Sequence, residues 1–77
     1  MRVVATTDRT VETKDCKVFN NISILEKFGI YAVIVVEKVT GIIETEAVRV
    51  LLNTTDIAKA FKCYNEHGGS NLVKEKD

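Results

Sequence analysis

Residues 30–38 read Ile-Tyr-Ala-Val-Ile-Val-Val-Glu-Lys and begin with the longest apolar run of the chain, Ile30 to Val36. Because β-branched and aromatic residues favour extended backbone, this stretch predicts a β-strand. An unbroken apolar run also indicates that both faces of the strand are covered, as at the centre of a sheet. After a three-residue loop at 39–41, with Gly41 in a left-handed conformation, Ile42 to Leu52 is expected to return as an antiparallel strand.

That loop sets the predicted hairpin register, with Ile30 opposite Val50 and Val33 opposite Ala47. Side chains alternate along a strand, so the apolar run divides into two sets. The first set is Ile30, Ala32, Ile34 and Val36, and the second is Tyr31, Val33 and Val35. If a helix covers the first set, the second meets either the N-terminal strand or tail of the chain itself or a partner.

The chain before residue 30 also predicts strands, because it lacks proline and is rich in Val, Ile and Thr. We expect a break at Asp8-Arg9 and a bulge or turn at Asn20-Asn21. The expected strand segments are Val3–Thr7, Cys16–Asn20 and Ile22–Phe28.

A helix is predicted after the hairpin. One of the residues 53–55 is expected to cap it, with Asp56 in the first turn and Gly68-Gly69 as the stop. Its apolar stripe has helical spacing and consists of Ile57, Ala60, Phe61 and Tyr64. The predicted fold class is therefore α+β: a three- to four-stranded antiparallel sheet with one C-terminal helix packed on one face. Residues 1–77 are expected to form a single small domain with a frayed tail over 70–77.

Composition limits the possible functions. A chain of 77 residues buries a thin core, so a partner or a second copy would help to stabilise it. Eleven basic residues balance eleven acidic ones, which argues against binding to duplex nucleic acid. The N-terminus does not have the pattern of a signal peptide, and no apolar run approaches the roughly 20 residues that span a bilayer. We therefore expect a cytoplasmic protein.

Few residues offer catalytic or ligand chemistry. Cys63 and His67 lie four residues apart and share a helix face, which makes them the one candidate nucleophile–base pair. A small apolar Cys and a His near the helix C-terminus explain the same residues without catalysis. Glu44 and Glu46 are expected to share one strand face, where they could act as a metal-binding or acid–base pair, but a solvated strand end accounts for them. No catalytic, cofactor-binding or metal-binding residues are predicted, since a zinc site lacks the usual close Cys spacing.

Lysines near two phenylalanines suggest an alternative function. Lys17, Lys27, Phe19 and Phe28 together could present rings and cations to a single-stranded nucleic acid. Such a surface needs these side chains on one face of adjacent strands, and Phe19 also suits the core.

Several short motifs resemble a family of small bacterial proteins of unknown function. The resemblance covers roughly residues 28–72 and rests on Phe28-Gly29-Ile30, Asn53-Thr54-Thr55-Asp56, Ala60-Phe61 and Tyr64-Asn65. In that family a Cys stands where this chain has Tyr64, and a proline and a histidine follow the helix. The resemblance implies no activity.

The apolar surplus of the sheet is the most informative functional feature. It predicts a non-enzymatic protein-interaction module that forms a homodimer or binds another protein, with Tyr31, Val33 and Val35 as the contact face. The alternatives are a single-stranded nucleic-acid binder and a small phage or mobile-element protein that binds and modulates a host protein. We expect no membrane association and no small-molecule substrate.

Overall fold

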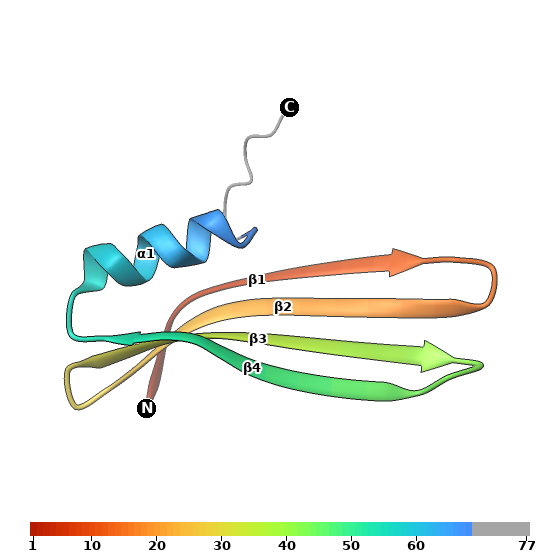
Figure 1. The fold of residues 1–77 in the computed structure, drawn as a ribbon, viewed down its shortest axis with the longest axis horizontal. Coiled ribbons are helices and arrows are strands. Elements are labelled where there is room, and N and C mark those ends of the chain that lie inside the picture. Colours follow the sequence, from red (N-terminus) through yellow and green to blue (C-terminus); the bar gives the residue numbers. More distant parts are fainter. Residues whose placement is uncertain (69–77) are drawn as a thin grey trace.

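The computed structural model describes residues 1–68 of the protein. Four antiparallel strands form one sheet in the order β1-β2-β3-β4, and a single helix lies against it (Figure 1). The elements are β1 (Arg2–Glu12), β2 (Cys16–Lys27), β3 (Ile30–Gly41), β4 (Thr45–Thr54) and α1 (Ile57–Glu66). The predicted α+β architecture is confirmed. Within the described residues no helix is long and apolar enough to cross a bilayer.

The helix covers only part of one face of the sheet. Figure 1 shows α1 above the half of the sheet near the β2–β3 turn, while the β1–β2 and β3–β4 loops extend away from it. The other face carries no element of the described chain. The molecule is accordingly flat, with extents of 42 × 29 × 16 Å.

The core lies between α1 and the two central strands. Its buried side chains are Ile22, Ile24, Val33, Ala60 and Tyr64. Phe61 packs edge-on against Tyr64 with ring centroids 6.1 Å apart, and the Tyr64 hydroxyl is hydrogen-bonded to the Thr7 hydroxyl on β1. Burying one large apolar side chain contributes about 1.5–3 kcal/mol to the free energy of unfolding. These few buried residues therefore provide most of the stability of the fold.

The helix begins at a different cap from the one expected. Asp56 is itself the N-cap, and its carboxylate accepts a hydrogen bond from the Ala58 amide at 2.9 Å. The Thr54 hydroxyl accepts from the Asp56 amide at 3.0 Å, which fixes the chain just before the cap. The predicted stop is confirmed at Gly68, whose φ is +94°. Gly69 and the expected frayed tail over 70–77 lie outside the described residues.

The N-terminal strands are longer and more regular than the sequence suggested. β1 continues through Asp8-Arg9, and its one irregularity is a bulge between Val3 and Ala5. β2 passes through Asn20-Asn21 without a bulge toward β3, with Asn21 paired with Val36. Asn20 and Asn21, which often occur in turns, adopt extended backbone here because β2 is a central strand and hydrogen bonds on both sides hold it extended.

The register of the last hairpin differs from the prediction by four residues. Val50 pairs with Ile34 and not Ile30, because β3 continues to Gly41 and the loop falls at 42–44. Gly41 has φ +137° and lies against the β1–β2 loop, where an added Cβ would come within 2.5 Å of the Asp15 carbonyl oxygen. Gly41 therefore has the expected positive φ, but it lies at the end of β3 and not in the loop, and its lack of a Cβ permits a close backbone approach.

Candidate functional site

The buried side chains of β2 identify which face of the sheet lies under α1. Ile22 and Ile24 on β2 are 6% and 0% exposed, and their partners on β3 are Val35 and Val33. Val33 is 0% exposed, and Tyr31 and Val35 pack against the same core. The prediction that Tyr31, Val33 and Val35 form a contact face is thereby corrected: these side chains face the helix of their own chain.

The uncovered apolar surface lies on the opposite side of the sheet. Alternation along β3 and β4 places Ile34 beside Val50 and Val36 beside Val48. Val48 and Val50 are 62% and 55% exposed. We define this surface as the open face, formed by Leu25, Ile30, Ala32, Ile34, Val36, Val48 and Val50. The largest apolar patch on an ordinary monomer covers about 300–600 Å², and patches of that size are often functional.

The open face is hollowed at the end near the β2–β3 turn. A largely apolar groove of about 300 Å³ is lined by Leu25 on β2, by Ile30, Ala32 and Ile34 on β3, and by Phe28 in the turn between them. The Phe28 side chain is 88% exposed. A groove and an exposed aromatic ring therefore adjoin each other on one surface.

Beside the open face, β1 and β2 carry a network of polar side chains. The Asn21 amide nitrogen donates to the Thr6 hydroxyl at 2.8 Å and to the Asp8 carboxylate. The Asn21 carbonyl oxygen accepts from the Ser23 hydroxyl at 2.7 Å, and the Thr6 and Ser23 hydroxyls lie 3.0 Å apart. Because these groups bond to one another, covering them costs less than covering unpaired polar groups.

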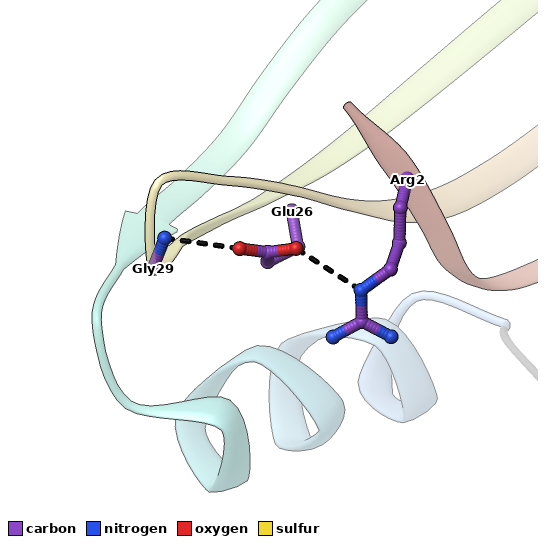
Figure 2. A network of polar contacts seen from close by, with 3 residues as sticks. All are labelled: Arg2, Glu26 and Gly29. Carbon is purple, nitrogen blue, oxygen red and sulfur yellow. Dashed lines mark hydrogen bonds and ion pairs between the residues drawn. The ribbon is translucent and has the colours of Figure 1, made fainter.

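The β2–β3 turn is held by a carboxylate. Glu26 accepts one hydrogen bond from the Gly29 amide and another from the Arg2 guanidinium on β1, each at 3.0 Å (Figure 2). The Gly29 bond, followed by the Arg2 contact, lowers the pKa of Glu26 below its usual value. The turn residues Phe28 and Gly29 both have positive φ, 54° and 78°, as in a type I′ turn.

The candidate pair Cys63 and His67 does not form an activated thiol. His67 Nδ1 lies 2.9 Å from the Cys63 carbonyl oxygen, so it donates there and cannot also accept the thiol proton across 3.8 Å. Burial, with a smaller contribution from the Glu66 charge, raises the pKa of the Cys63 thiol. This shift is the opposite of what a cysteine nucleophile requires.

The residues considered for nucleic-acid binding are spread along β2. Phe19 and Phe28 are roughly 30 Å apart along the strand, given about 3.3 Å per residue. Lys17 lies 3.9 Å from the Glu12 carboxylate, and Lys27 lies over the Phe28 ring at 5.3 Å. The structure does not gather these cations and rings into one site.

The two acidic residues considered as a pair in the β3–β4 hairpin lie in different structural elements. Glu44 lies in the loop, whereas Glu46 belongs to β4, so they do not share a strand face. Among residues 1–68, no group of three or more His, Cys, Asp or Glu side chains could hold a metal ion.

The open face was not predicted as the contact surface, although the sequence contains a signal for it. Ile22 and Ile24 alternate with Asn21 and Ser23, and this alternation identifies the side of β2 that is buried. A comparison with protein-family models, curated proteins and solved structures finds no significant match to this chain.

Proposed function

We propose that this chain is a protein-interaction module that docks through the open face and associates with a second copy of itself. The observation that carries the proposal is the continuous apolar surface on β3 and β4 opposite α1. The helix α1 lies on the other face, and no second element of the described residues buries this one.

The size of the molecule supports docking by a whole sheet face. A stable protein interface buries about 800 Å² on each partner, and the two longer extents of the molecule, 42 and 29 Å, leave room for a contact of that size on a broad face. Five buried side chains among residues 1–68 make a small core, so association through apolar surface would add stability.

A pair of matched variants tests the proposal. Val50 on β4 and Val11 on β1 lie on edge strands with similar exposure, 55% and 48%. Val11 pairs with Val18 on the side of the sheet that carries α1, so it is outside the open face. Light scattering at several concentrations should show that Val50→Lys dissociates the oligomer, while Val11→Lys leaves its mass unchanged. Equal effects of the two substitutions, or a monomeric wild type at every concentration, would contradict the proposed self-association.

A further inference from the structure

The β2–β3 turn holds an aromatic residue in an unfavourable backbone conformation and exposes its side chain to solvent. Phe28 has φ 54°, a left-handed conformation that bulky L-residues seldom adopt, and its side chain is 88% exposed. Asn or Gly would be the ordinary residue at this position of a type I′ turn. Strained residues of this kind concentrate at binding and catalytic sites, which makes the position a candidate for function.

The groove beside Phe28 has the size and lining to take such a ring. Its volume is about 300 Å³ and its apolar walls come from Leu25, Ile30, Ala32 and Ile34. A closed apolar cavity of roughly 150 Å³ already accommodates one benzene ring. The molecule's own Phe28 contributes to the groove's lining, but it is 88% exposed and so does not fill the groove.

We infer that Phe28 of one copy inserts into the groove of a second copy, and that the second copy's Phe28 inserts reciprocally into the first. This inference rests on the proposed function and names the anchoring side chain and its receptor site. A two-fold interface is isologous, so a ring and a groove on the same surface are satisfied together in both copies. Buried aromatic side chains seated in pockets are the usual source of most binding energy at an interface.

The chain's own C-terminal residues are a weaker candidate for the groove. The described chain ends at Gly68, which lies with Thr7 and Ile22 on the side of the sheet that α1 covers. The nine residues after Gly68 contain two large apolar residues, Leu72 and Val73, whereas the open face presents seven apolar side chains. A second copy supplies an apolar surface of equal size.

The turn geometry fixes the presentation of the ring before docking. The Glu26 carboxylate binds the Gly29 amide at 3.0 Å, and Arg2 holds the same carboxylate from β1 (Figure 2). A ring held on a rigid turn loses less conformational freedom on binding than one on a mobile loop.

Phe28→Asn is the decisive variant because it removes the ring and creates the Asn-Gly pair that type I′ turns prefer. The fold should therefore survive while the dissociation constant of the dimer rises about 30-fold or more, as for an interface hot spot. The matched control is Ile42→Asn, which removes an 80% exposed apolar side chain from the β3–β4 loop at the other end of the sheet. Its dissociation constant, measured by sedimentation equilibrium, should stay within about twofold of wild type.

A second readout follows the ring directly. The chain contains no tryptophan, so Phe28→Trp introduces a single indole. Its emission should shift to shorter wavelength as the protein is concentrated, and adding Val50→Lys should abolish that shift. If Val50→Lys dissociates the dimer while Phe28→Asn does not, the insertion of Phe28 is refuted, and association through the open face is still supported. If wild type remains monomeric throughout, both proposals fail.

Discussion

Replacing Phe28 with Asn should also stabilise the monomer, and the size of the effect follows from the turn. Holding an L-residue in the left-handed region costs about 1–2 kcal/mol, and Asn tolerates this region better than other residues with a Cβ. The substitution sacrifices the contact between the Lys27 ammonium and the Phe28 ring, which is worth about 0.5–1 kcal/mol at an exposed site. We expect a net gain of about 0.5 kcal/mol, or about 2–4 °C in Tm for a domain of this size.

The assay is urea unfolding followed by circular dichroism at a protein concentration low enough to keep the chain monomeric. Phe28→Ala serves as one control, because it loses the Lys27 contact and keeps a Cβ residue at positive φ. Gly29→Ala serves as the other: an added Cβ meets no atom within 4 Å, so its cost of about 1 kcal/mol comes from the backbone alone. An Asn variant that is less stable than wild type would refute the argument from backbone strain.

Three further predictions concern the core, the turn and the thiol. Val33→Ala, at a 0% exposed position, should destabilise the fold by about 2–3 kcal/mol, and an effect under 1 kcal/mol in urea unfolding would contradict its place in the core. Because the pKa of Glu26 is lowered in the folded state, the Glu26 carboxylate stabilises the fold above its usual pKa of 4.5, and this contribution is lost as pH falls through its folded-state pKa. Glu26→Gln should therefore flatten the acidic part of the pH–stability profile. Cys63, in a variant without the other cysteine, should react with iodoacetamide at pH 8 more slowly than a free model thiol, since its raised pKa leaves less thiolate, and a faster reaction would exclude that shift.

The helix is the most predictable part of the fold because its signals are local. The spacing of Ala60, Phe61 and Tyr64 and the glycine at residue 68 are sufficient to locate α1. The sequence predicts Asp56 in the first turn and not at the N-cap, because several adjacent residues are all good caps and only the backbone geometry selects among them.

The two faces of β3 could not be distinguished from β3 alone. Every residue from Ile30 to Val36 is apolar, so alternation carries no information there. The information lies in the turn at Phe28-Gly29: two turn residues place Lys27 opposite Ile30, and this register brings Ile24 beside Val33. A neighbouring strand therefore decided which side of β3 is buried.

The last hairpin was misread because its loop resembles a strand. Ile42 and Ile43 have high β-propensity, yet they lie in the loop and are 80% and 64% exposed. The position of Gly41 depends on its contact with the β1–β2 loop, about 25 residues earlier in the sequence. Local propensity does not reflect a contact with a segment so distant in the sequence, and the predicted register therefore differs by four residues.

The β2–β3 turn joins the stability of the fold to its proposed docking function. Arg2 connects β1 to Glu26, and Glu26 in turn fixes Gly29, so the first strand contributes to the position of a ring that it does not touch. A turn of ordinary sequence would be more stable by itself, and in the proposed dimer the docking of the Phe28 ring would offset the strain of its positive φ. Stability measured on the monomer and affinity measured on the dimer should therefore respond in opposite directions to Phe28→Asn, whereas a purely structural role for Phe28 would move both in the same direction.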